Sequence, residues 1–314
     1  MLSRWFLLLP LWLFLLTGCG KPPPPITIAI NPWPGYEMLY LAEQKGLFQQ
    51  VGLNVKLYQL SSLADAQRSY LNGRSDGFTS TLIEAVHANF QGARPLKIIQ
   101  VPDFSNGGDV IIGRKGMTVA DLKGKIVGCE VNSLGIFMLY KALQQVGLTL
   151  DDVTVRNKEQ LAGYEAMERG EIDAFVAYPP SSVELLKDSR FQVLFSSAEI
   201  PGQIIDVISV RASLLEEDPL FQSKMLQVWD LALAYMDQHP DEAYGIMAER
   251  EGLSTEDFQS ALQDLQIMDS GQQIQLLRES EDLRDNLESV CLILNMINGM
   301  DYDCANSKDI LAAP

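Results

Sequence analysis

Short apolar runs alternate with longer amphipathic stretches along the chain from Ile26 onward. Compact apolar runs are typical of buried strands, and apolar residues three or four positions apart are typical of helices. The pattern predicts strands over residues 26–30, 53–60, 76–80 and 96–101, and helices over residues 36–50, 63–71 and 82–90. Strands and helices in alternation indicate a mainly parallel sheet with helices on both of its faces.

A second α/β series continues the chain after the first. It predicts strands over residues 110–113, 125–128, 153–156, 174–177, 191–195 and 204–210, and helices over residues 134–146, 161–169 and 182–187. From Leu214 onward the pattern predicts helices only, with breaks near Pro240, Gly252 and Gly271.

Two such series predict two lobes. We expect lobe 1 to comprise residues 26–115 and 205–314, with a helical C-terminal extension, and lobe 2 to comprise residues 116–204. The chain would then cross twice between the lobes, near residues 114–118 and 199–203. Two crossings favour a pair of lobes that close about a hinge.

The N-terminus carries the pattern of an export signal. Arg4 precedes an apolar run over residues 5–16, which is too short to span a bilayer but typical of a signal sequence. The following Leu16-Thr17-Gly18-Cys19 resembles the lipobox of bacterial lipoproteins, which implies that residues 1–18 are removed and that Cys19 is acylated. Acyl chains would hold the protein at the periplasmic face of a membrane. The alternative is an ordinary secretory signal with an unrelated cysteine.

A proline-rich segment follows Cys19. Lys21 and four consecutive prolines predict a stiff, extended tether over residues 19–25. Such a spacer would hold the folded domain away from the bilayer.

Charge and cysteine content narrow the functional classes. The 314 residues include 41 acidic and 24 basic side chains, and a formal charge of -17 disfavours nucleic-acid partners. Two histidines and no clustered cysteines give no metal-ligand spacing. Cys291 and Cys304 could form a disulfide in an oxidising compartment, whereas Cys129 follows an apolar run and is expected to be a buried free thiol.

Four predicted strand-to-helix turns are candidates for a ligand site, because open α/β sheets bind ligands beyond the carboxyl ends of their strands. These turns begin near Asn31, Thr79, Asn132 and Tyr178. Ser80 and Ser133 could instead be helix N-caps, and Trp33 and Tyr178 could be core aromatics. The candidate ligand-binding residues in or beside the turns are Trp33, Gly35, Tyr36, Ser80, Thr81, Ser133, Leu134, Gly135, Phe137 and Tyr178.

Acidic residues accompany the turns. Asp103, Asp109 and Asp206 lie at predicted strand ends or crossings, and the four turns contain no Arg or Lys. Several carboxylates near one cleft would disfavour a bare anion. We therefore expect an amine or a nitrogen heterocycle, stacked against aromatic side chains that include Phe104.

Several segments in order resemble the nitrate/sulfonate/taurine and thiamine-precursor (NitT/TauT-like) binding proteins of ABC importers. The resemblance covers about residues 26–210 and fades in the helical C-terminal third. Its segments are NPWPGYEMLYLAEQKGLFQQVGLNVKLYQL from Asn31, VPDFSNGGDVIIGRKG from Val101, DLKGKIVGCEVNSLGIFML from Asp121, GLTLDDV from Gly147 and EAMERGEIDAFVAYPP from Glu165.

The resemblance implies a two-lobed type II periplasmic-binding-protein fold. It also implies a protein that closes on a small molecule and delivers it to an ABC permease with a cytoplasmic ATPase. We expect this protein to be a monomer and to need no cofactor. Two alternatives stay open: a ligand-sensing lipoprotein for a membrane receptor, and an enzyme similar to the pyrimidine-precursor synthases that share this fold.

Overall fold

The structure is a computed structural model that describes residues 24–92 and 94–313. The predicted signal sequence, the acylation of Cys19 and most of the predicted tether lie outside the described residues. None of the described helices combines the length and the apolar character that a bilayer crossing requires.

The first sheet has the strand order β2-β1-β3-β11-β4. Strand β1 pairs in parallel with β2 and β3, whereas β11 lies antiparallel between β3 and β4. The sheet is therefore mixed rather than purely parallel. Its strands are β1 (Ile26–Ile30), β2 (Val55–Gln59), β3 (Gly77–Thr81), β4 (Leu96–Gln100) and β11 (Asp206–Arg211).

The second sheet has the order β10-β6-β9-β7-β8 and forms lobe 2 with the helices around it. Its strands are β6 (Val110–Arg114), β7 (Ile126–Cys129), β8 (Thr154–Asn157), β9 (Ala174–Ala177) and β10 (Phe191–Ser196). Here β6 lies antiparallel between β10 and β9, so it belongs to lobe 2. This corrects the predicted boundary at residue 115, since the first crossing precedes β6, over residues 106–109. The second crossing lies over residues 200–205, just before β11.

A two-stranded ribbon contradicts the prediction that only helices follow Leu214. Strand β12 (Leu265–Ile267) pairs antiparallel with β5 (Asp103–Ser105). Each strand has only three residues, and their partners are far apart in sequence, so local periodicity gives no signal for either. The ribbon ties the C-terminal third to the first crossing.

The helices match the predicted alternation with one break. The single helix expected over residues 36–50 is split into α1 and α2, because Gly46 adopts a left-handed conformation with φ of 67°. The helices of the α/β series are α1 (Glu37–Gln44), α2 (Leu47–Gln50), α3 (Leu63–Leu71), α4 (Leu82–Gln91), α5 (Leu134–Gln145), α6 (Gln160–Glu168) and α7 (Ser181–Leu186).

The C-terminal helices complete lobe 1. Trp229 in α9 is fully buried, and α9 packs against α1 and α2. A disulfide joins Cys291 in α13 to Cys304, as the sequence allowed, and Cys129 is a buried free thiol. These helices are α8 (Ala212–Glu217), α9 (Phe221–Gln238), α10 (Pro240–Glu251), α11 (Thr255–Gln263), α12 (Ser270–Glu279) and α13 (Glu281–Asn298).

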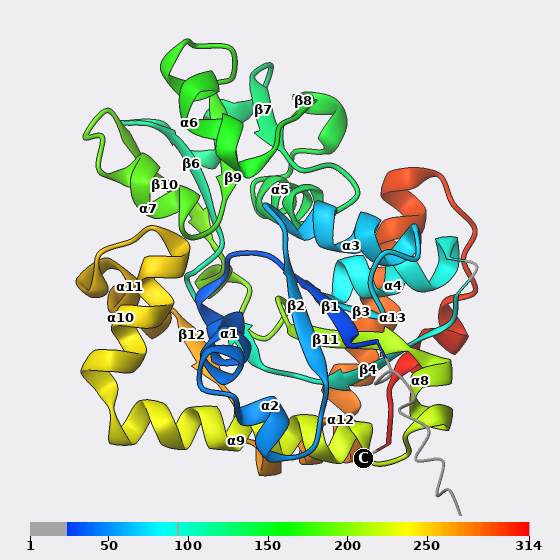
Figure 1. The fold of residues 1–314 in the computed structure, drawn as a ribbon. Helices are drawn as coiled ribbons and strands as arrows, with labels where there is room; N and C mark the ends of the chain where they lie inside the picture. Colours follow the sequence, from blue (N-terminus) through cyan, green and yellow to red (C-terminus); the bar gives the residue numbers. More distant parts are fainter. Residues whose placement is uncertain (1–23, 93, 314) are drawn as a thin grey trace, which may run out of the picture.

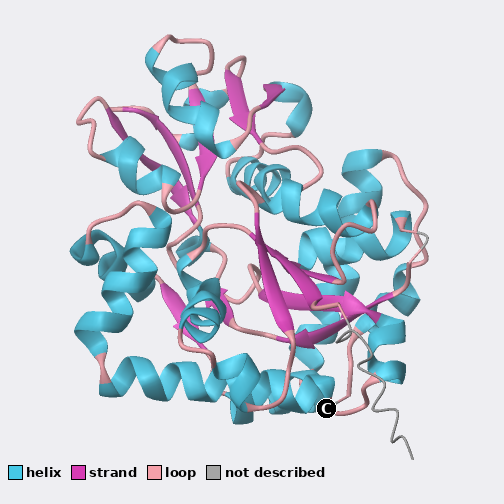
Figure 2. Cartoon of the chain, in the orientation of Figure 1, coloured by secondary structure: helices cyan, strands magenta, loops and turns pink. Residues whose placement is uncertain are grey.

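The two sheets with their helices form two lobes that meet along one boundary (Figure 1). Lobe 2 lies at the top of the view, and the long helix α9 runs along the bottom, beneath the first sheet. Figure 2 shows that helices flank both sheets, as expected for an α/β fold. The predicted two-lobed α/β fold class is thus confirmed.

Candidate ligand-binding site

A narrow hollow lies where the carboxyl ends of strands from both lobes face each other. It is too tight to admit a water molecule between the described side chains. Its lining comes from lobe 1, from lobe 2 and from the first crossing. The lining residues are Asn31, Trp33, Leu63, Thr81, Asp109, Leu134, Tyr178 and Asp206.

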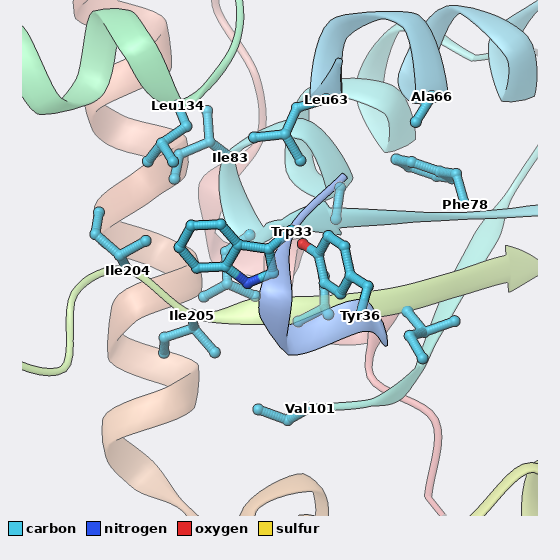
Figure 3. Close-up of a cluster of buried hydrophobic side chains, with 14 of the residues drawn as sticks. Trp33, Tyr36, Leu63, Ala66, Phe78, Ile83, Val101, Leu134, Ile204 and Ile205 are labelled. Atoms are coloured by element: carbon cyan, nitrogen blue, oxygen red, sulfur yellow. The ribbon is translucent and has the colours of Figure 1, made fainter. Parts of the chain in front are cut away.

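The turn after β1 brings Trp33 into the hollow. Pro34 begins a short 3-10 helix, Pro34–Tyr36, for which its fixed φ is suited. The Trp33 ring lies edge-on to the ring of Tyr178 in lobe 2, with ring centroids 6.1 Å apart. Figure 3 shows Trp33 surrounded by buried apolar side chains, among them Leu63 from lobe 1 and Leu134 from lobe 2.

Three buried aspartates, which we call the acidic triad, surround this turn: Asp103, Asp109 and Asp206. The Trp33 Nε1–H donates a hydrogen bond of 3.3 Å to Asp103 Oδ1, and the Tyr36 hydroxyl donates to Asp206 Oδ1. The Oδ2 atom of each triad member has no hydrogen-bond partner in the described part of the chain. The side chains of Asp103 and Asp206 also interact with each other, so Asp109 has the clearest free acceptor capacity.

Burial dominates the electrostatics of the triad. It raises the pKa of Asp103 and of Asp109 to about 7, because a charged carboxylate loses its hydration there. Burial also raises the pKa of Asp206 well above its usual range, with the charges of its two triad neighbours adding to the effect. None of the eight described residues that line the hollow is Arg, Lys or His, so none supplies a positive charge.

Lobe 2 adds a further acid beside the hollow. The Tyr178 hydroxyl lies 3.3 Å from Glu130 Oε2, and the backbone N–H of Leu63 donates to the same hydroxyl over 3.2 Å. Burial raises the pKa of Glu130 to about 8. Tyr178 thus links the two lobes while contacting another buried carboxyl group.

The N-terminus of α5 is occupied by a side chain that sequence reasoning missed. Glu84 in α4 of lobe 1 accepts hydrogen bonds of 2.6 Å from the Ser133 hydroxyl and from the Leu134 N–H of lobe 2. Ser133 makes no capping bond to its own helix. The signal for Glu84 was present in the sequence, because Thr81 and Glu84 have the spacing of a capping box.

The predicted site residues divide into three groups. Six of them line the hollow: Trp33, Thr81, Asp109, Leu134, Tyr178 and Asp206. Gly35, Tyr36, Asp103 and Ser133 adjoin it through the contacts described above or by close approach to Asp103. Asn31 and Leu63 also line it but were not among the predicted residues.

The remaining four predicted residues neither line the hollow nor make the contacts described beside it: Ser80, Phe104, Gly135 and Phe137. Ser80 is buried within β3, and Phe104 lies in the β5–β12 ribbon. A Cβ on Gly135 would lie 2.9 Å from the Glu130 carbonyl oxygen, so this glycine permits close packing of α5 against the preceding turn.

A wider cleft of about 800 Å³ also lies at the lobe boundary. Its lining includes the exposed side chains of Leu161 and Glu184 from lobe 2 and the end of α10 in lobe 1. The wider cleft has two buried polar side chains, Gln160 and Glu251, whereas the narrow hollow gathers those of Asn31, Thr81, Asp109 and Asp206 beside two aromatic rings. We therefore assign the candidate site to the narrow hollow. The described residues hold no group of three or more side chains placed to bind a metal ion.

Comparisons with known proteins agree with this architecture. The profile of the NMT1/THI5-like family matches residues 33–243. A Brucella abortus protein named as a binding protein is 27% identical over 225 residues, which cover 68% of this chain and 67% of that protein. A 4-amino-5-hydroxymethyl-2-methylpyrimidine phosphate synthase of Aspergillus parasiticus is 30% identical over 144 residues, covering 45% of this chain and 41% of the synthase.

Solved structures share the fold at low sequence identity. The alkanesulfonate-binding protein SsuA of Xanthomonas axonopodis pv. citri, bound to MOPS, has a TM-score of 0.76 and 16% identity, with 92% of this chain and 99% of SsuA covered. The nitrate-binding protein NrtA of Synechocystis has a TM-score of 0.68 and 13% identity, with 91% of this chain and 84% of NrtA covered. The chain therefore belongs to the NMT1/THI5-like family and has the fold of periplasmic binding proteins.

Proposed function

We propose that the protein is the solute-binding component of an ABC importer and that it captures a nitrogen-containing, positively charged or hydrogen-bond-donating small molecule between its lobes. The observation that carries this proposal is the acidic triad. Three buried carboxyl groups converge on an aromatic hollow, and no basic residue lines it.

The triad favours a ligand that brings donors and positive charge. Ionising a buried carboxyl group without a partner costs several kcal/mol, which is why its pKa rises. An amine or protonated heterocycle would supply the missing partner and would donate to the free Oδ2 atoms. An anion would instead add repulsion in a poorly solvated space. Trp33 and Tyr178 provide the aromatic surfaces against which a flat ring or an ammonium group packs well.

Capture would require the lobes to move. The hollow is too tight for a water molecule, so a ligand would enter after the lobes separate about residues 106–109 and 200–205. Closure would then be favoured by the contacts that the ligand makes with both lobes at once. A micromolar dissociation constant corresponds to about 8 kcal/mol, which a few hydrogen bonds and buried aromatic contacts can supply.

The relatives support this reading in different ways. Importer-type binding proteins for alkanesulfonates and nitrate share the fold, and a pyrimidine phosphate synthase shares part of the sequence. The buried acids of this chain suit the nitrogenous class of ligand. We further propose that the protein acts as a monomer, anchored by acylated Cys19 at the periplasmic face, where it would meet its permease.

An enzymatic function is the second candidate, because of the relative named as a synthase. The residues that line the hollow include no histidine or cysteine. His87 is buried in α4, where its Nδ1 pairs with Gln67 Nε2 over 3.1 Å. Formation of any product during incubation with candidate ligands would favour the enzyme.

A thermal-shift panel tests the proposed ligand class. We expect stabilisation by benzylamine or by 4-amino-5-hydroxymethyl-2-methylpyrimidine, and none by methanesulfonate or nitrate at matched ionic strength. Asp206→Asn should remove the shift, whereas Asp151→Asn, at an exposed position, should preserve it. Stabilisation by the anions alone would refute the proposal.

A further inference from the structure

Glu84 is a fully buried carboxylate that contacts both lobes. Its Oε2 atom accepts from the Thr81 N–H and the Thr81 hydroxyl, over 2.9 and 2.6 Å, and so fixes the side chain to lobe 1. Its Oε1 atom accepts from Ser133 and Leu134 of lobe 2, each over 2.6 Å. All four contacts are within hydrogen-bond range, and two of them cross the lobe boundary.

The donors that Glu84 engages in lobe 2 would otherwise form an anion-binding site. The first N–H groups of a helix have no partner within the helix, and the helix dipole adds partial positive charge there. A serine hydroxyl beside them completes a set of donors suited to a sulfonate, nitrate or carboxylate group. In this chain α5 has 12 residues, and its N-terminus faces the hollow through Leu134.

We propose that Glu84 determines ligand specificity by excluding anions from the cleft. Its carboxylate takes the position that an anionic ligand group would need at the N-terminus of α5. The Thr81 bonds lie within lobe 1, so the carboxylate stays at the cleft when the lobes separate and repels anions before closure as well. This inference rests on the proposed function only in taking the cleft as the ligand site.

Removing the carboxylate should therefore create anion binding. We expect Glu84→Ala to lower the dissociation constant for methanesulfonate at least about tenfold relative to the unaltered protein, because the freed donors bind charged acceptors well. The measurement is isothermal titration calorimetry on the full chain, with sodium chloride at the same ionic strength as reference. Adding Ser133→Ala to Glu84→Ala should reverse part of the gain, since the hydroxyl donor is then lost.

Glu199→Ala is the matched control. Glu199 has the same capping-box role in the 3-10 helix Ser197–Glu199 of lobe 2, at an exposed position. It should show no gain in anion binding. If Glu84→Ala does not fold, as judged by circular dichroism, Glu84→Gln removes the charge; because its amide still occupies the N-terminus of α5, its gain in methanesulfonate affinity over the unaltered protein should be smaller and come from the lost repulsion alone.

Two results would overturn the inference: a folded Glu84 variant with no more anion binding than Glu199→Ala, or tight methanesulfonate binding by the unaltered protein. Failure of both benzylamine and 4-amino-5-hydroxymethyl-2-methylpyrimidine to bind would refute the nitrogenous ligand but leave the methanesulfonate comparison intact. The two proposals can therefore fail separately.

Discussion

Asp109 should make the protein without ligand less stable as the pH rises. Burial raises the pKa of its carboxyl to about 7, from a usual value of 3.8. In the unfolded chain the group loses its proton near pH 4, whereas in the folded protein it keeps the proton until about pH 7. The stabilisation that the protonated carboxyl gives the folded state is therefore fully present below pH 4. It declines as the pH rises further and is lost once the pH has passed about 7.

The size of the effect follows from the pKa difference. About three pH units, at about 1.4 kcal/mol per unit, correspond to about 4 kcal/mol of unfolding free energy. Asp109→Asn removes the ionisation and keeps the shape. The variant should match the unaltered protein at pH 4 and exceed it by up to about 4 kcal/mol at pH 8.

Urea unfolding, followed by tryptophan fluorescence at both pH values, measures this difference. Asp151→Asn, at an exposed position, should change stability by less than about 0.5 kcal/mol at either pH. The same Asp109→Asn variant should bind benzylamine more weakly, because the acid that destabilises the free protein is the one that pairs with the ligand. A variant no more stable than the unaltered protein at pH 8 would refute the argument from burial.

Three further substitutions test the turn, the disulfide and the aromatic wall. Gly35→Ala should lower the unfolding free energy by about 1–3 kcal/mol, because the added Cβ would lie 2.0 Å from Asp103 Oδ2. The control is Gly245→Ala in α10, where a Cβ meets open space; it should be neutral or stabilising in the same urea titration. Joint replacement of Cys291 and Cys304 by alanine should cost about 3 kcal/mol in that assay, given a sequence separation of 13, and an unchanged midpoint would count against the cross-link. Trp33→Ala should abolish the thermal shift with benzylamine, and a retained shift would remove Trp33 from the site.

Much of the fold could be predicted because local patterns agree with tertiary packing. Residues 63–71 and 174–177 match α3 and β9 to the residue. Pairings distant in sequence could not be predicted from local periodicity. Strand β6 joins the second sheet through β9 and β10, and β5 pairs with β12, so the first lobe boundary was placed too late.

The candidate site was predictable at the level of turns but not of side chains. The turns that carry Trp33 and Tyr178 do converge, because both follow strands whose carboxyl ends face the lobe boundary. Phe137 is buried in α5 but is not among the residues that line the hollow. Glu84 was missed because its role depends on a contact between two lobes, although its capping-box spacing was visible.

Proton release on binding tests the central claim most directly. If the acidic triad is protonated before a cation arrives and ionised afterwards, binding must expel protons near pH 6. A pH-stat titration with the tightest-binding ligand of the panel that is already a cation at pH 6 should count about one proton released per ligand bound, and Asp109→Asn should lower that count. Saturable binding with no proton release, or with proton uptake, would contradict the account.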